Sequence, residues 1–258
     1  MGIVNVTPDS FSGDGLTDPA AALARALEQH AAGADVIDVG GESTRPGHAP
    51  VDVQVETERV LPVIAALRRQ LPNVPISVDT YKPQVARAAH AAGADIVNSV
   101  WGAPDELLEV AAALNMPIVA MHNRHGSDYA GRDVVECVVE FLRDCARRAN
   151  AHGIASERVL LDPGIGFGKT ADQNLALLRR LDELTALGYP TLLGVSRKST
   201  LGKLTGREPS DRVYAGAAAA ALAVNAGIDI VRVHDVAATR DAAAVADAVV
   251  RGWRSWET

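Results

Sequence analysis

Seven polar or charged residues, each at or near the end of a short apolar segment, are the residues of this chain best suited to chemistry. They are Asn5, Asp79, Asn98, Asp162, Lys198, Arg232 and His234. Arg232 and His234 stand two residues apart in one extended segment, so their side chains point to the same side. An arginine and a histidine presented together make a binding site for an anion, and Arg45 and Lys198 could add positive charge to it.

Eight short apolar segments must position these residues. The segments cover residues 3–5, 36–38, 76–79, 96–98, 118–122, 160–162, 192–196 and 230–234. Between successive segments lies an Ala- and Leu-rich stretch with the period of a helix, so the chain repeats a strand–helix unit about eight times. This pattern predicts an α/β protein, a (β/α)8 TIM barrel, in a single domain over residues 1–258.

The carboxyl ends of the parallel strands in such a barrel meet on one face, where barrel enzymes have their active sites. We therefore expect the seven residues to share one pocket. Any one of them could merely end a strand or begin a turn, but the whole set at corresponding positions favours a shared site. Residues 7–15 and 40–47 are expected to form long loops on the same face, and such loops usually carry function.

Composition and charge narrow the class of protein. A chain of 258 residues has the usual length of one barrel, and 48% hydrophobic residues are enough for a globular core. The net charge of −7 argues against binding to nucleic acid or to an anionic membrane, so an anionic ligand needs a local positive cluster. No signal peptide is visible and the apolar stretch at 215–224 is too short to span a bilayer, which predicts a cytoplasmic protein.

Local signals place the first helix and the two cysteines. Asp18 followed by Pro19 predicts a helix start, and Gly33 predicts its end after residues 31–32. Cys137 and Cys145 fall on one predicted helix, too far apart to bridge comfortably, and are expected to be reduced structural thiols.

The glycine-rich segment at residues 162–170 ends in Gly-Lys-Thr but does not fit a nucleotide-binding loop. A P-loop needs glycine where this chain has Pro163, and the glycine spacing also fails the dinucleotide fingerprint. We interpret the glycines as letting the backbone pass close to a planar ligand. His122 and His125 lie close together, but without the partners that a zinc site needs.

Several of these stretches together resemble the dihydropteroate synthase family. The resemblance rests on residues 5–12, 40–47 and 162–169, with Asp79-Thr80, residues 196–199 and residues 232–235, in the same order over nearly the whole chain. It implies the transfer of a dihydropterin methylene group from pyrophosphate to the amine of para-aminobenzoate, a step of folate synthesis. It also implies magnesium as cofactor, inhibition by sulfonamides and a homodimer.

The resemblance further implies roles for individual residues. Those implied for catalysis are Asn5, Arg45, Lys198, Arg232 and His234, and Asn5 is also the implied metal ligand. The pterin would contact Asp79, Asn98, Met121, Asp162, Lys198 and Arg232. Pyrophosphate would be held by Asn5, Thr44, Arg45, Arg232 and His234. Para-aminobenzoate would be bound by Thr44, Pro46, Phe167, Lys198 and Ser199.

The chain also departs from the family pattern. Ser99 stands where most members have aspartate, Ala217 replaces a threonine, and Gly13-Asp14 reverses the order usual in the first loop. We expect Ser99 to point away from Asn98 and Ala217 to be structural. The sequence begins within the first strand, so either the true start lies upstream or this member does without the usual N-terminal segment.

Three other functions were weighed. A methyltetrahydrofolate methyltransferase has a similar barrel but no pyrophosphate to expel, and residues 43–47 with Arg232 and His234 argue against it. A paralogue that binds pterins without turnover would be expected to lack residues of the two long loops. An aldolase or isomerase could use Lys198, but it would not explain residues 5–12.

Overall fold

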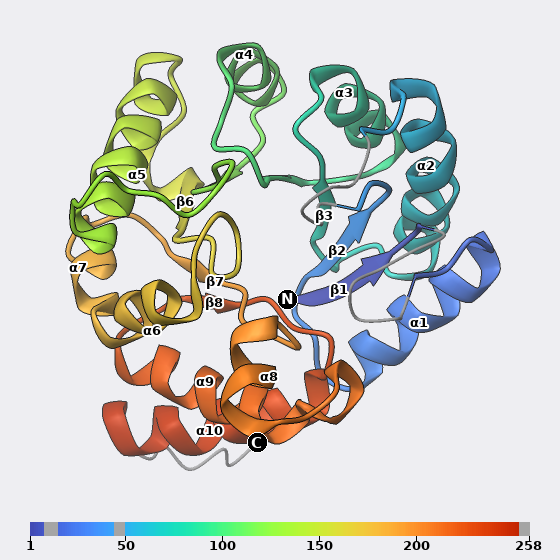
Figure 1. The fold of residues 1–258 in the computed structure, drawn as a ribbon. Helices are drawn as coiled ribbons and strands as arrows, with labels where there is room; N and C mark the ends of the chain where they lie inside the picture. Colours follow the sequence, from blue (N-terminus) through green and yellow to red (C-terminus); the bar gives the residue numbers. More distant parts are fainter. Residues whose placement is uncertain (8–14, 44–49, 253–258) are drawn as a thin grey trace.

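The computed structural model describes residues 1–7, 15–43 and 50–252, and these form a closed barrel of eight parallel strands (Figure 1). The strands are β1 (Gly2–Asn5), β2 (Ile37–Gly40), β3 (Ile76–Asp79), β4 (Ile96–Ser99), β5 (Ile118–Met121), β6 (Val159–Asp162), β7 (Leu192–Leu193) and β8 (Ile230–Val231). Each of the eight predicted segments overlaps one of them. The (β/α)8 prediction is therefore confirmed.

The strands pair in sequence order around the barrel. Strands β1 to β6 form one continuous parallel sheet, and β7 pairs with β8. Two parallel bridges, Leu161 with Thr191 and Gly2 with Val233, join the two sheets and close the circle. Closure leaves no unpaired sheet edge and brings β8, which precedes Arg232 and His234, beside β1, which ends in Asn5.

Helices lie outside the strands (Figure 1). They are α1 (Pro19–Ala31), α2 (Val53–Gln70), α3 (Pro83–Ala92), α4 (Asp105–Ala113), α5 (Val134–Ala151), α6 (Ala171–Arg179), α7 (Leu181–Thr185), α8 (Ser199–Thr205), α9 (Val213–Asn225) and α10 (Val236–Arg251), with short 3-10 helices at Ser156–Arg158 and Pro209–Asp211. Asp18 caps α1 as predicted, because its side chain accepts a hydrogen bond from the Ala20 amide at 3.1 Å. Gly33 then turns the chain toward β2 with a φ of +97°.

The inside of the barrel has an apolar layer beneath a polar one. The apolar layer holds Met1, Val119, Leu160 and Leu192, with Val36, Ile96 and Ile230 packed against them. Side chains along a strand point alternately into and out of the barrel. The residues two positions after six of these apolar residues therefore also point into the barrel. Those residues are Asp38, Asn98, Met121, Asp162, Gly194 and Arg232. Four of these six residues are polar or charged, so the barrel has an apolar floor and a largely polar mouth.

Three smaller predictions concern other parts of the chain. Cys137 and Cys145 both lie on α5 and are free thiols, as expected. Ala217 lies within α9, which fits its structural interpretation. No helix in residues 1–7, 15–43 and 50–252 is long and apolar enough to cross a membrane. The cytoplasmic location stays a prediction.

Candidate active site

A pocket opens at the carboxyl ends of the strands, and all seven residues expected there line it. Asn5, Asp79, Asn98, Asp162, Lys198, Arg232 and His234 surround the pocket, together with Met121 and Phe167. They come from the ends of β1, β3, β4, β5 and β6 and from the segments after β6, β7 and β8. Residues scattered over 230 positions therefore line one pocket, and their roles there stay predictions.

Arg232 lies at the centre of a buried ionic group within this pocket. Its guanidinium donates from Nε to Asp38 Oδ2 at 2.7 Å and from a terminal nitrogen to Asp79 Oδ2 at 2.7 Å. Asn98 Nδ2 donates to the same oxygen of Asp38 at 3.2 Å. The two carboxylates offset the arginine's charge and fix its plane, so Arg232 presents a rigid face to the pocket.

Asp38 was not among the residues singled out from the sequence. Its side chain is wholly buried, and it holds both Arg232 and Asn98. The signal that could have found it is its place at the end of the apolar segment 36–38, equivalent to Asn98 and Asp162 in their own segments. Glu42, Ser43 and Ser196 also line the pocket without having been singled out.

Burial shifts the proton affinities of three groups in the pocket. The pKa of Asp79 rises to about 7, because burial outweighs the stabilising charge of Arg232 and because Asp38, Glu56 and Glu42 add negative charge nearby. Burial also raises the pKa of Asp162 and lowers that of Lys198 to about 8, although these two groups attract one another. Burial therefore moves the pKa values of Asp79 and Lys198 toward neutral pH from opposite sides.

Lys198 and Asp162 present a donor and an acceptor side by side. Lys198 Nζ donates to the Ile165 carbonyl at 2.5 Å and lies 4.6 Å from the centre of the Phe167 ring. Asp162 Oδ1 accepts from the Gly164 amide at 2.7 Å. A flat heterocycle that both donates and accepts along its edge can pair with such an arrangement.

The glycine-rich loop after β6 packs against the end of β5. A Cβ atom on Gly164 would lie 1.9 Å from the His122 carbonyl oxygen, and one on Gly168 would lie 2.3 Å from that of Arg124. Both glycines also have positive φ angles, of 67° and 57°. These two glycines therefore allow two loops to pack closely against one another. That the glycines also let the backbone approach a planar ligand stays a prediction.

Lys169 braces this loop from inside. Its Nζ lies within hydrogen-bond distance of the Gly164 carbonyl at 2.9 Å, the Phe167 carbonyl at 2.9 Å and His122 Nδ1 at 2.8 Å. Burial lowers the pKa of Lys169 to about 7 and that of His122 to about 3. The lysine of the Gly-Lys-Thr sequence therefore makes its hydrogen bonds to protein groups, which agrees with the argument against a P-loop.

His234 is held by the segment that follows β7. Both its backbone nitrogen and its Nδ1 lie near Ser196 Oγ, at 3.1 and 3.0 Å. The next residues of the two segments also pair: Arg197 forms a bidentate ion pair with Asp235, with distances of 2.6 and 3.0 Å. The sequence motifs at 196–199 and 232–235 therefore position one another as well as the pocket.

Some predicted residues are not placed in the pocket. Thr44, Arg45 and Pro46 lie outside the described residues, as does most of the segment 5–12. Ser199 is the first residue of α8 and is exposed, and it does not line the pocket. Ser99 is fully buried beside Asn98 and also absent from the lining, which agrees with its expected outward direction.

A closed parallel barrel with a polar pocket at the carboxyl ends of its strands is the architecture of TIM-barrel enzymes. The family model for pterin binding enzymes matches residues 1–234 of the chain. A dihydropteroate synthase from Clostridium beijerinckii is 42% identical over 97% of this chain and 94% of its own length.

Solved structures agree with the sequence matches. A dihydropteroate synthase from Clostridium difficile, crystallised in the presence of pteroic acid, has a TM-score of 0.91 at 45% identity, covering 97% of this chain and 96% of that one. The Xanthomonas albilineans dihydropteroate synthase with 4-aminobenzoic acid has a TM-score of 0.89 at 47% identity, covering 96% and 92%. The chain belongs to the pterin-binding enzymes and, within them, to the dihydropteroate synthases, which are transferases of folate biosynthesis.

Proposed function

We propose that the chain joins 6-hydroxymethyl-7,8-dihydropterin pyrophosphate to para-aminobenzoate and releases dihydropteroate and pyrophosphate. The bond between the methylene carbon and the pyrophosphate oxygen breaks, a carbon–nitrogen bond forms to the aniline nitrogen, and that nitrogen loses a proton. The observation that carries the proposal is the convergence of Asp79, Asn98, Asp162, Lys198 and Arg232 on one pocket in a chain of this family.

The pterin is assigned to the polar residues that surround the barrel mouth. Asp162 and Asp79 accept from the ring nitrogens and the amino group, and Lys198 donates to the acceptors. Met121 gives the pterin ring an apolar contact. The Arg232 guanidinium, whose plane is fixed by Asp38 and Asp79, gives the pterin a flat cation to stack on. Burial raises the pKa of Asp79 to about 7, whereas the neighbouring Arg232 favours its carboxylate form.

The pyrophosphate is assigned to Asn5, Arg232 and His234, with Thr44 and Arg45 expected to contribute. Magnesium suits such a site, because it usually takes one or two protein oxygens and completes its shell with substrate phosphates and water. The Asn5 amide oxygen, at the end of β1 and in the pocket wall, is a ligand of that kind. A bound magnesium ion would neutralise charge on the leaving pyrophosphate.

Para-aminobenzoate is assigned to the side of the pocket formed by Phe167 and the Lys198 side chain. Phe167 is held there by Lys169, which binds its carbonyl. Thr44, Pro46 and Ser199 complete the assignment as predictions from the family resemblance. The aniline nitrogen is neutral at pH 7, so its attack needs no strong general base.

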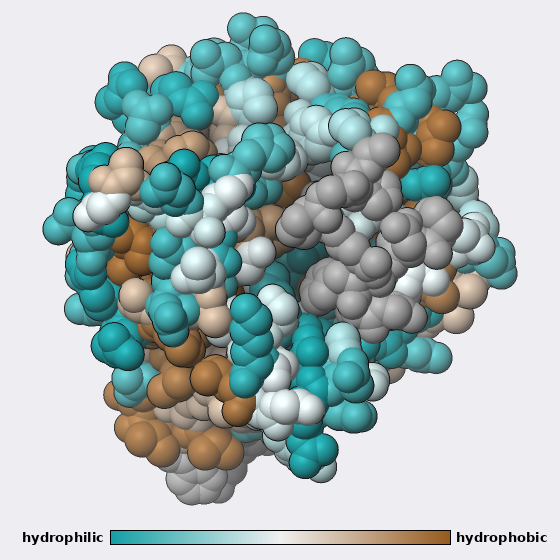
Figure 2. Space-filling view, viewed as in Figure 1, coloured by the Kyte–Doolittle hydropathy of each residue, from teal (hydrophilic) through white to brown (hydrophobic). Residues whose placement is uncertain are grey.

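A second copy of the chain is proposed to cover α8, α9 and α10. Hydrophobic residues gather at the lower left of Figure 2, where Figure 1 draws α9 and α10. Exposed large apolar side chains on these three helices include Leu204, Leu222, Val245 and Val249. Light scattering should give twice the mass of one chain, and Leu222→Glu should reduce the mass to that of a monomer.

Pyrophosphate release tests the proposed reaction. With purified protein, dihydropterin pyrophosphate and Mg²⁺, we expect release that increases when para-aminobenzoate is added and stops when the metal is removed with a chelator. The variant Asn5→Ala should need a higher Mg²⁺ concentration for half-maximal rate. Binding of the pterin without release would favour a paralogue that has lost turnover, and unchanged release in chelator would overturn the role of magnesium.

A further inference from the structure

A buried asparagine on α6, Asn174, joins the loop after β6 to the first turn of α8. Its Oδ1 accepts from the Gly166 amide at 2.8 Å, and its Nδ2 donates to Thr200 Oγ1 at 3.0 Å. Because a backbone amide can only donate, Gly166 fixes which way the asparagine side chain points. Asn174 and Thr200 are both almost wholly buried, and neither lines the pocket.

Lys198 lies between the two groups that Asn174 holds. Its Nζ donates to the carbonyl of Ile165, the residue before Gly166, and its backbone lies two residues before Thr200. A Cβ atom on Gly166 would lie 3.1 Å from Lys198 Cδ, so the lysine side chain packs directly against this glycine. Asn174 therefore sets the spacing between the helix turn from which the lysine starts and the carbonyl that receives its ammonium group.

The backbone just before Lys198 has an uncommon conformation. Arg197 has a φ of 58°, in the left-handed region that residues other than glycine seldom adopt. Its side chain pairs with Asp235, and its carbonyl accepts from Arg212 at 2.7 Å. A Cβ atom on Gly202 would lie 2.2 Å from the Arg212 guanidinium, so this glycine makes room for the donor. Such strain persists where the surrounding contacts enforce it, as they do here next to the pocket.

The hydrogen bonds of Asn174 are better explained by precision than by stability. Folding exchanges hydrogen bonds with water for hydrogen bonds within the protein, so the net gain is small, and apolar groups in place of both partners can be nearly neutral. A buried polar network whose members are all satisfied instead fixes one arrangement of the groups that it joins. The arrangement fixed here is that of Gly166 and Thr200 on either side of Lys198.

We infer that Asn174 is a positioning residue: by joining Gly166 to Thr200 it places the Lys198 ammonium in the pocket, and it touches neither substrate itself. The inference rests on the proposed function, because Lys198 is the group assigned there to both the pterin and para-aminobenzoate. Any effect of Asn174 on ligand binding should therefore pass through Lys198.

A double-mutant cycle tests this inference, with the affinity for dihydropteroate, the product of the proposed reaction, measured by calorimetry. Asn174→Leu should raise the Kd by about tenfold, because Lys198 loses its position. The same substitution in Lys198→Ala should change the Kd by less than about twofold, because the ammonium group is already gone. A further tenfold loss on top of Lys198→Ala would overturn the inference.

A matched pair at Thr200 keeps the inference testable if urea denaturation shows that Asn174→Leu does not fold. Thr200→Val has nearly the shape of threonine but removes the acceptor of Asn174 Nδ2, and it should raise the Kd by about fivefold. Thr200→Ser keeps the hydroxyl and should return the Kd to within about twofold of the original chain. The same Kd in both folded variants would contradict the inference.

Asn150 provides the control for losing a hydrogen-bonded asparagine. It joins the segments before β6 and β7, because it donates to the Ile154 carbonyl at 2.9 Å and accepts from the Tyr189 hydroxyl at 2.6 Å. Asn150→Leu should lower the free energy of unfolding in urea, as Asn174→Leu should, but leave the Kd within about twofold. An equal rise in Kd for both variants would assign the effect to lost packing and overturn the inference.

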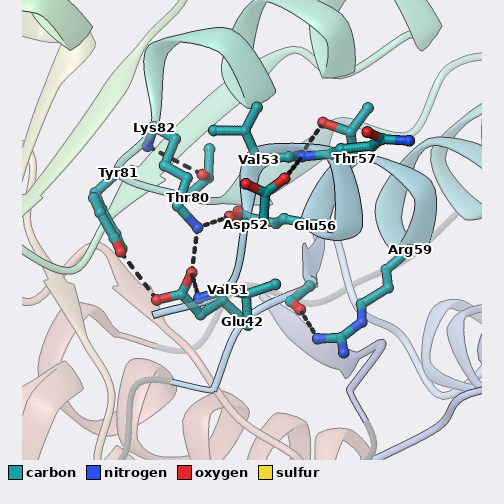
Figure 3. Close-up of polar contacts among 12 residues, drawn as sticks. Glu42, Val51, Asp52, Val53, Glu56, Thr57, Arg59, Thr80, Tyr81 and Lys82 are labelled. Atoms are coloured by element: carbon teal, nitrogen blue, oxygen red, sulfur yellow. Dashed lines mark hydrogen bonds and ion pairs between the residues drawn. The ribbon is translucent and has the colours of Figure 1, made fainter. Parts of the chain in front are cut away.

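A polar cluster across the barrel provides the control for additivity. Lys82 donates to Glu42 and Glu56, and the Tyr81 hydroxyl donates to Glu42 at 3.0 Å (Figure 3). These residues follow β2 and β3 or lie on α2, and β3 stands opposite β7 in the ring of eight strands. Tyr81→Phe should therefore change the Kd by the same factor with and without Lys198. Coupling as strong as that of Asn174 would contradict a specific link between Asn174 and Lys198.

These binding measurements need no turnover. A chain that binds dihydropteroate but releases no pyrophosphate would contradict the proposed reaction, and the cycle would still decide whether Asn174 acts through Lys198.

Discussion

Replacing Asp38 by asparagine tests whether the buried ionic group around Arg232 holds the site together. Asp38 Oδ2 accepts from both Arg232 and Asn98, whereas its Oδ1 is buried with no hydrogen-bond partner among the described residues. An asparagine that turns its oxygen toward Arg232 must place its amide nitrogen where Oδ1 lies, without an acceptor. Removing one partner of a buried ion pair costs about 3–5 kcal/mol, and Arg232 keeps Asp79, so we expect about 3 kcal/mol.

Urea denaturation of the unliganded protein, extrapolated linearly to water, measures this loss. Asp35→Asn, three residues earlier in the sequence, is the matched control. Asp35 is exposed and its ion pair with Arg240 is long, at 3.9 Å, so its replacement should change the free energy of unfolding by less than about 0.5 kcal/mol. A loss below about 1 kcal/mol for Asp38→Asn, or equal losses in both variants, would refute the reasoning.

Three other predictions rest on contacts in and around the pocket, and a fourth, on Ser199, rests on the family resemblance. Lys198→Ala should lower the rate by at least about tenfold, or about 1.4 kcal/mol of transition-state stabilisation, in steady-state assays; unchanged turnover would remove Lys198 from the reaction. Because the pKa of Asp79 is raised from 3.8 to about 7, its carboxylate is lost as pH falls below 7, and pterin affinity should weaken there in calorimetry but not in Asp79→Asn. The same raised pKa makes this group's contribution to folding stability fall as pH rises from about 4 to 7. Lys169→Met should lower the free energy of unfolding by about 2 kcal/mol, because two partly buried carbonyls lose their donor, and should raise the KM for para-aminobenzoate; a stable variant with a normal KM would contradict this. Ser199→Phe should weaken sulfonamide binding more than dihydropterin pyrophosphate binding in competition assays. Equal losses for both ligands would refute the assignment of Ser199 to the para-aminobenzoate site.

The fold and most of the pocket could be predicted because one physical rule governs both. Side chains alternate along each strand, so an apolar residue such as Leu160 and a polar one such as Asp162 reach the same interior at different depths. The sequence shows this alternation directly. It also shows the start of α1 at Asp18, because capping is decided by residues next to one another.

What could not be predicted depends on pairings between distant residues. Lys82 and Glu42 are 40 positions apart, and nothing local indicates that the ends of β2 and β3 bring them together. The sequence argued against a P-loop around Lys169 but could not indicate its contacts with Gly164, Phe167 and His122. Ser199 was expected in the pocket, but the first turn of α8 leaves it exposed.

The central claim is that residues at the strand ends of this barrel catalyse the joining of a pterin to para-aminobenzoate. The most direct test is to measure dihydropteroate by mass spectrometry alongside pyrophosphate, in the original chain and in Lys198→Ala and Asp162→Asn. We predict one dihydropteroate for each pyrophosphate in the original chain and a rate at least about tenfold lower in both variants. Pyrophosphate release without dihydropteroate, or full rates in both folded variants, would contradict the account.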